Sequence, residues 1–402
     1  MTSQPPWRTL PVLGAVLVAL TSVALPQQPA KRPQLPAGAD TNDANSYYQY
    51  GVAGLRERPG AAAQAFFWAH RLSPDWADPL YGQWVATLLR SSRLPEYLDG
   101  DRNTVRSKEY RSVDSLLYAA LALNPFIYRR FDRMLFDEYI QIYARRYEAR
   151  TGRILNRAIL FDQFREDVLS DNPSLWGWMQ YAEGRWAEAT EAYNLALKRV
   201  RHPASVLASR ARVSFLKNDY PAALADMQAA LEDRQKIEEK DLVYFYDSKA
   251  VFHHSIGVLY ELMKDPASAR EAYASALQED LSYHQGHVRL AALALEAGDT
   301  ATAISEYDLA AQIRENDPVV RYQLGVLLRK QGRCAEAVEH FKAAIAADSL
   351  FAPPYVELGQ AYETLAQPDE ARAQYHAFIA HAAHDDADLT RAGQRLEALK
   401  SR

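Results

Sequence analysis

The sequence contains one cysteine and few of the residues that interrupt helices. Because Cys334 is its only thiol, a chain of 402 residues cannot form an internal disulfide, and its stability has to come from a packed core. Cys334 itself is expected to be a small packing residue. Glycine accounts for 17 residues and proline for 20, and the prolines are concentrated near the N-terminus. Ala, Leu, Glu, Arg and Gln dominate the rest, which predicts a mostly helical protein.

An excess of positive charge is also absent. The formal net charge is −5, which argues against nucleic acid as the main partner, because such binding depends on neutralising phosphates. The sequence has no glycine-rich phosphate loop, no serine nucleophile elbow and no His-Glu-x-x-His zinc helix. We therefore expect no catalytic residues, no cofactor and no metal site. An enzyme with its site in residues 43–169 is the less favoured alternative.

The N-terminus carries a pattern typical of export. After Arg8, residues 9–25 read TLPVLGAVLVALTSVAL, an apolar run that ends in the small residues Ser22 and Ala24. The run is short for a membrane span, so residues 1–25 are predicted to be a cleaved signal peptide. The alternatives are an uncleaved anchor that tethers the protein to a membrane through residues 9–25, or a buried core helix. Both the cleaved signal peptide and the uncleaved anchor predict an exported protein, which is either periplasmic or secreted.

A proline-rich linker follows the apolar run. Residues 26–42 read PQQPAKRPQLPAGADTN and show no apolar periodicity, which is typical of an extended tether. Folded structure is expected from about residue 43.

The second half of the sequence repeats with a period of 34 residues. A small residue recurs in each copy, an alanine follows it after twelve positions, and an aromatic residue follows the alanine after four. The small residues are Gly257, Ala291, Gly325 and Gly359; the alanines are Ala269, Ala303, Ala337 and Ala371; the aromatics are Tyr273, Tyr307, Phe341 and Tyr375. Small residues let two antiparallel helices approach closely, and the aromatic side chain fills the remaining space.

This pattern resembles the tetratricopeptide repeat (TPR), which has the same period. The resemblance implies an all-α, TPR-like solenoid of helical hairpins that winds as a right-handed superhelix. About six repeats are expected over residues 170–383, with an insert near residues 232–245. Residues 384–402 are predicted to form a capping helix, with an apolar stripe of Leu389, Ala392, Leu396 and Leu399.

Residues 43–169 form a less regular helical region with degenerate units. One such unit is indicated by Gly51, Ala63 and Phe67, and residues 126–169 are helical by pattern without a repeat. A basic stretch from Arg102 to Arg157 is interleaved with acidic residues, which favours salt-bridged helices. The alternative is a patch for an anionic partner, such as a membrane surface or an acidic protein segment.

By resemblance, the first helix of each repeat lines a concave groove that binds a peptide or a helix of another protein. The expected function is a non-catalytic interaction scaffold; a membrane-tethered assembly factor is the alternative. The candidate groove residues are Trp178, Arg212, His254, Val258, Arg289, Tyr322, Val326, Arg329 and Gln360. Trp178 is the favoured anchor, because an exposed tryptophan is a common hot spot.

Two groups of histidines are candidate metal or proton-switch sites. His381 and His384 stand next to Asp385 and Asp386 before the predicted capping helix, and capping is favoured there over metal binding. The second group is His253, His254, His284 and His287, for which packing is favoured over a metal or a proton switch.

Overall fold

The computed structural model describes residues 31–98, 104, 107–154, 156–238 and 249–400, and every regular element within them is a helix. The predicted signal segment lies outside these residues, as does the start of the predicted linker. The helices of the N-terminal half are α1 (Ala44–Gly54), α2 (Pro59–Leu72), α3 (Ala77–Arg90), α4 (Leu94–Leu98), α6 (Lys108–Leu123), α7 (Asp132–Thr151), α8 (Arg157–Asp171), α9 (Pro173–Ala182) and α10 (Trp186–Leu197). Those of the C-terminal half are α11 (Ala204–Leu216), α12 (Tyr220–Glu238), α13 (Lys249–Leu262), α14 (Pro266–Glu279), α15 (His284–Glu296), α16 (Thr300–Ile313), α17 (Pro318–Lys330), α18 (Cys334–Ala347), α19 (Pro353–Thr364), α20 (Pro368–His381) and α21 (Asp388–Lys400).

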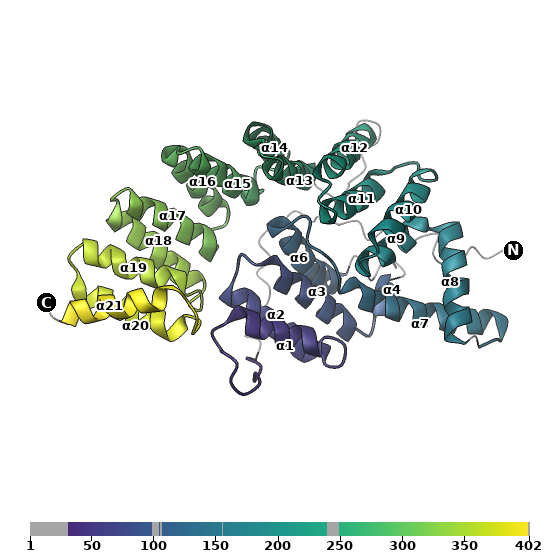
Figure 1. The fold of residues 1–402 in the computed structure, drawn as a ribbon, viewed down its shortest axis with the longest axis horizontal. Coiled ribbons are helices and arrows are strands. Elements are labelled where there is room, and N and C mark those ends of the chain that lie inside the picture. Colours follow the sequence, from purple (N-terminus) through teal and green to yellow (C-terminus); the bar gives the residue numbers. More distant parts are fainter. Residues whose placement is uncertain (1–30, 99–103, 105–106, 155, 239–248, 401–402) are drawn as a thin grey trace. The chain divides into compact units, whose positions relative to one another are not determined.

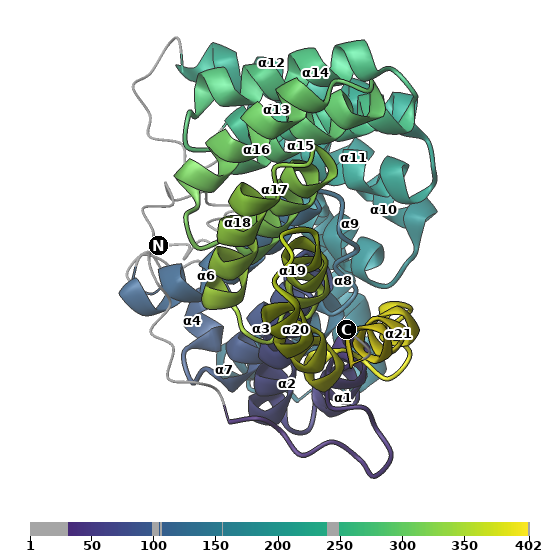
Figure 2. The ribbon, with the colours of Figure 1, turned by 90° about the vertical axis from the view of Figure 1, so that its left-hand side faces the viewer.

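Consecutive helices pack against each other as hairpins. The pairs α9–α10, α11–α12, α15–α16, α17–α18 and α19–α20 are each in extensive contact, and α18 in turn packs against α19 (Figure 1). Figure 2 shows α15 to α18 stacked in chain order. The predicted all-α array of helical hairpins is therefore confirmed, and α21 packs on α20 as its last helix, with Ala392, Leu396 and Leu399 buried.

The repeated small and aromatic residues hold each hairpin together. Gly325 on α17 lies so close to α18 that a Cβ atom there would stand 2.6 Å from the ring of Phe341. Gly359 and Tyr375 repeat this contact in the next pair, with a corresponding distance of 2.8 Å. The aromatic ring thus packs directly on the glycine of its own hairpin, whereas the sequence pattern predicted that it fills the space between one helix pair and the next. A side chain at the glycine would force the two helices apart.

The turn inside each hairpin also repeats every 34 residues. Gly298 and Gly332 both have a positive φ, 79° and 77°, just before the second helix begins. Ala366 holds the same place in the next repeat with φ 56°. A left-handed residue ends a helix and turns the chain back, which is why glycine is preferred at this position.

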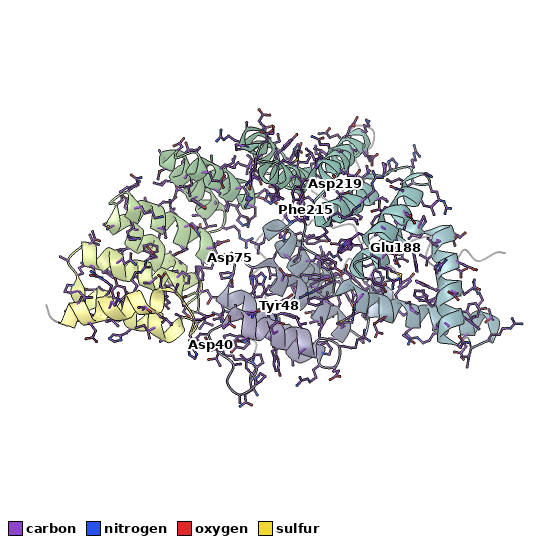
Figure 3. All side chains as sticks on the ribbon, in the orientation of Figure 1. Asp40, Tyr48, Asp75, Glu188, Phe215 and Asp219 are labelled. Atoms are coloured by element: carbon purple, nitrogen blue, oxygen red, sulfur yellow. The ribbon has the colours of Figure 1, made fainter. Side chains whose placement is uncertain are left out.

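The chain divides into two compact units. The first comprises the described residues of Arg56–Gly60 and Tyr81–Ala272, and the second those of Gln28–Leu55, Ala61–Leu80 and Tyr273–Arg402. Within the second unit, α2 and the segment before α1 contact the last repeats. Arg71 at the end of α2 forms two hydrogen bonds to the carboxylate of Asp348, with lengths of 2.7 and 2.9 Å. The carboxylate of Asp40, labelled in Figure 3, accepts the backbone N–H of His384 at 2.6 Å.

The degenerate unit predicted near residue 51 forms the hairpin of α1 and α2, but with a different aromatic partner. A Cβ atom on Gly51 would lie 2.8 Å from the ring of Phe66, which is fully buried, whereas Phe67 is only half-buried. Phe66 also packs against Tyr48, labelled in Figure 3, at a centroid distance of 5.5 Å. The alignment on Phe67 was therefore wrong by one residue, because glycine and ring are 15 positions apart here and 16 in the regular repeats.

The predicted insert lengthens a helix. α12 continues to Glu238, well beyond the length of the second helix in the other repeats. The rest of the insert, residues 239–248, lies outside the described residues.

Candidate functional site

The predicted groove residues lie on the first helices of successive hairpins. In the first unit, Trp178 is on α9, Arg212 on α11, and His254 and Val258 on α13. In the second unit, Arg289 is on α15, Tyr322, Val326 and Arg329 are on α17, and Gln360 is on α19. His254 is buried and the other eight are half-buried, so each already contacts the protein on at least one side.

In the first unit, this helix face is covered by the segment that joins α6 to α7, residues 124–131. Phe126 stacks on Phe215 of α11, labelled in Figure 3, with centroids 4.3 Å apart and rings nearly parallel. Phe126 is 1% exposed and belongs to the same apolar cluster as Leu207 and Ala211. The hydroxyl of Tyr128 donates to the carbonyl of Ala182 at the end of α9, at 3.1 Å. The chain itself therefore occupies the face of α9 and α11.

A buried ion pair anchors this segment. Asp132, at the start of α7, is 0% exposed, and its carboxylate lies 2.9 Å from the guanidinium of Arg129. The indole N–H of Trp178 donates to Asp132 at 2.7 Å, and the hydroxyl of Tyr81 donates to it at 3.0 Å. Burial raises the pKa of Asp132, and the charge of Arg129 opposes this shift. Because two donors and a cation satisfy the carboxylate, it can remain in the core.

Trp178 is consequently engaged within the protein. Its ring packs edge-on against Phe136 of α7 at a centroid distance of 4.3 Å, and the guanidinium of Arg129 lies 5.7 Å from its centroid. An external partner could contact Trp178 only by competing with these residues. Residues 126–169 show no repeat in the sequence, and the aromatic residues Phe126, Tyr128 and Phe131 are the one sequence sign of a buried segment there.

In the second unit, the equivalent face belongs to α15, α17 and α19. The ring of Tyr322 packs near two other aromatic rings, with centroid distances of 6.3 Å to Phe341 and 5.6 Å to Phe351. Burial, reinforced by the charges of Glu357 and Asp388, raises the pKa of Tyr322 to about 12, so its hydroxyl stays protonated at neutral pH. One turn further along α17, Val326 packs against the same core and remains half-buried.

Two ion pairs involve residues of α17, α19 and α21, and the first of them lies close to Tyr322. The guanidinium of Arg329 contacts the carboxylate of Glu357 on α19 at 2.6 Å. Glu363, near the end of α19, pairs with Arg395 of α21 and accepts the hydroxyl of Tyr375 at 2.6 Å. These arginines have carboxylate partners, so the face offers apolar and aromatic surface bordered by balanced charge. Such a surface is suited to a peptide or helix of mixed composition more than to a polyanion.

The candidate metal and thiol sites have ordinary packing. His381 stacks on Tyr355 at 5.3 Å, while the exposed ring of His384 lies 3.8 Å from Asp40. Among the described residues there is no group of three His, Cys, Asp or Glu side chains placed to hold a metal ion. Cys334 is buried at the start of α18. Over all of the residues that the structure describes, no helix is long and apolar enough to cross a membrane.

Two histidines lie close to Asp317, which caps α17: His284 is buried and His70 is half-buried. His284 on α15 lies 3.9 Å from its carboxylate, and burial, reinforced by Arg314 and His287, lowers the pKa of His284 to about 3. His70 on α2 is also close enough to feel the charge of Asp317, and burial lowers its pKa as well. Both rings are therefore neutral in the folded protein at neutral pH.

We expect the second unit to lose stability between pH 7 and pH 5. Below a pH of about 6.5, histidines of the unfolded chain bind protons that the same histidines in the folded protein do not. The free energy of unfolding therefore decreases as the pH is lowered. For His284 alone the loss is about 2 kcal/mol at pH 5. Thermal melts at both pH values measure the loss, and H284Q should reduce it. An unchanged pH dependence in H284Q would show that His284 is not the group responsible.

Comparison with known proteins finds one family. Residues 263–318 and 322–375, from before α14 into α20, match the family model described as tetratricopeptide repeat. No curated protein sequence matches the chain.

Three solved structures with similar folds share little sequence with this chain. One is YrrB, a TPR protein with an unusual peptide-binding site. It is 21% identical, and the match covers 52% of this chain and 100% of that chain with a TM-score of 0.40. The second is pilF of Pseudomonas aeruginosa. It is 15% identical, and the match covers 58% of this chain and 98% of that chain with a TM-score of 0.42. A third is the TPR2AB domain of yeast Sti1 in its pHSP90 complex. It is 18% identical, and the match covers 58% of this chain and 99% of that chain with a TM-score of 0.26.

Proposed function

Because the chain carries tetratricopeptide repeats at residues 263–375, we propose that it is a non-catalytic scaffold that binds a peptide or a helix of a partner protein. The proposed site is the face of α15, α17 and α19 in the second unit. Tyr322 is the observation that supports it most directly: a half-buried aromatic side chain next to Val326 and bordered by paired charges. This is the composition of a protein-binding hot spot with a polar rim.

The proposed location is the cell envelope or the secreted space. It is supported by the export pattern of residues 1–25 and the proline-rich linker after it. If residues 9–25 are not cleaved, the same scaffold is a membrane-tethered assembly factor. The intact mass of the protein recovered from cells separates the two cases.

A photo-crosslinking amino acid at Val326 should trap the partner in living cells, because this position is half-buried on the proposed face. Leu309 on α16 is the matched control, since it is an exposed aliphatic residue on the second helix of a pair. We expect a protein adduct from position 326 that is absent from position 309. Equal adducts from both positions, or none from 326, would contradict binding at this face.

The contribution of Tyr322 can be measured once the partner is known. Replacing a central aromatic anchor costs about 2 kcal/mol or more of binding free energy, so Y322A should weaken binding at least about 30-fold. L309A should bind normally, and circular dichroism should show that both variants remain helical. Normal binding by a folded Y322A would move the site away from this face.

A further inference from the structure

The hairpin of α7 and α8 in the first unit ends in exposed aliphatic side chains. Helix α7 ends at Thr151 and is capped by Gly152, which has a left-handed φ of 65°, and the side chain of Asn156 caps the start of α8. Between and just after them, Ile154 is 82% exposed and Ile159 is 52% exposed. Single exposed aliphatic residues are common, but two at one turn indicate a contact surface. The turn lies away from α9, α10 and α11 (Figure 1).

The same turn is strongly basic. Residues 149–161, ARTGRILNRAILF, contain three arginines and no carboxylate, whereas the whole chain has a net charge of −5. Arg150 and Arg153 are exposed, and the guanidinium of Arg150 lies 5.7 Å from the centroid of the Tyr147 ring. Ion pairs occur at the other end of α7, where Asp132 meets Arg129 and Asp137 meets Arg56. The predicted salt-bridged character of the basic stretch thus holds for the start of α7.

Carboxylates on the hairpin lie further from the turn. Glu148 on α7 and Asp162 and Glu166 on α8 are exposed and flank residues 149–161 on both sides. Arg145 stands three residues before Glu148, and Arg165 stands next to Glu166 in the sequence. The positive charge is therefore concentrated at the turn itself, where the exposed isoleucines are.

We propose that this turn, defined by Arg150, Arg153, Ile154 and Ile159 and called the hairpin tip below, binds the surface of an anionic phospholipid bilayer. The arginines would contact lipid phosphates, and the two isoleucines would enter the boundary between headgroups and acyl chains. The shape favours lipid over an acidic protein. A turn at the end of a hairpin is convex, and a bilayer accepts a protruding aliphatic side chain anywhere on its surface, whereas a protein would need a matching pocket.

The lipid contact is independent of peptide binding at α15, α17 and α19. The hairpin tip belongs to the first unit and lies outside the residues that match the repeat family. Loss of one activity should leave the other intact, so the two proposals can fail separately.

Vesicle co-sedimentation tests the proposal with the chain from residue 26 onward, which keeps every described residue and removes the apolar segment 9–25. The vesicles are phosphatidylcholine with and without about one-third phosphatidylglycerol. We expect binding only to the anionic vesicles, weakened by raised salt. The double variant R150E/R153E and the double variant I154N/I159N should each weaken binding at least about tenfold.

Matched controls separate the tip from general surface effects. K217E/K330E reverses the charge at two exposed lysines outside the tip. L281N replaces an exposed leucine of the second unit with a polar residue. Both should bind like the parent chain, and all variants should keep their helical circular dichroism. Binding that ignores the phosphatidylglycerol, or a loss that is equal in tip and control variants, would overturn the proposal. So would binding of soluble polyglutamate through the tip without any binding of vesicles, which would identify an acidic protein as the partner.

Discussion

Replacing Asp132 with alanine should destabilise the first unit by about 3–5 kcal/mol. The substitution leaves the guanidinium of Arg129 buried without its counter-ion and removes the acceptor of the Trp178 indole and the Tyr81 hydroxyl. An uncompensated buried charge is among the most costly single changes in a protein core. It should also release the segment that begins at Phe126 from the face of α9 and α11.

Chemical denaturation followed by circular dichroism measures this effect, with each unfolding transition fitted separately because two units need not unfold together. D137A is the matched control on the same helix, since Asp137 pairs with Arg56 at the surface, where both side chains are about half exposed. An exposed pair contributes at most about 1 kcal/mol. D132N should fall between the two, because it keeps an acceptor and loses the charge. If D132A were no worse than D137A, the buried pair would not anchor the segment.

Gly325 and Gly393 should respond in opposite directions to the same substitution. G325A should destabilise the second unit by about 1–3 kcal/mol, because its Cβ would stand 2.6 Å from the fully buried ring of Phe341. G393A should stabilise α21 by up to about 1 kcal/mol, because nothing lies within 4 Å of its Cβ and alanine is the better helix former.

Thermal and denaturant unfolding of the two variants, each with one added methyl group, gives the comparison. A smaller side chain in place of the Phe341 ring tests the cause. F341L is destabilising by itself, but it should reduce the loss of stability that G325A causes when both are combined. A double-mutant cycle measures this coupling. If G325A and G393A changed stability by the same amount and sign, helix propensity would explain both, and the close approach of α17 to α18 would not be required.

The repeat could be predicted in detail where packing is local. Gly325 contacts Phe341 within one hairpin, and Ala337 is buried one turn before Phe341, so their spacing in the sequence reflects the spacing of helical turns. The fold class and the hairpins from α15 to α20 followed from this periodicity. The α1–α2 hairpin, where the spacing is one residue shorter, was placed correctly as a hairpin with the wrong ring.

The candidate site was less accessible to prediction. Tyr322, Val326 and Arg329 share a face of α17 as their spacing requires, but their use by a partner stays a prediction. Trp178 occupies the corresponding place on α9, and its indole is bonded to a carboxylate 46 residues earlier in the chain. No local pattern connects Trp178 to Asp132, because their contact arises when the α6–α7 segment folds over α9 and α11.

The sequence by itself determined the all-helical architecture and the register of the repeated hairpins, because each hairpin buries its apolar stripe against its nearest neighbours along the chain. The tertiary structure alone decided which of the equivalent helix faces stay accessible and which charges become buried. It placed Asp132 and Arg129 in the core, brought Arg71 to Asp348, and left Ile154 in solvent. These outcomes depend on contacts between distant segments and on surface left uncovered after packing, and neither has a period that a sequence can display.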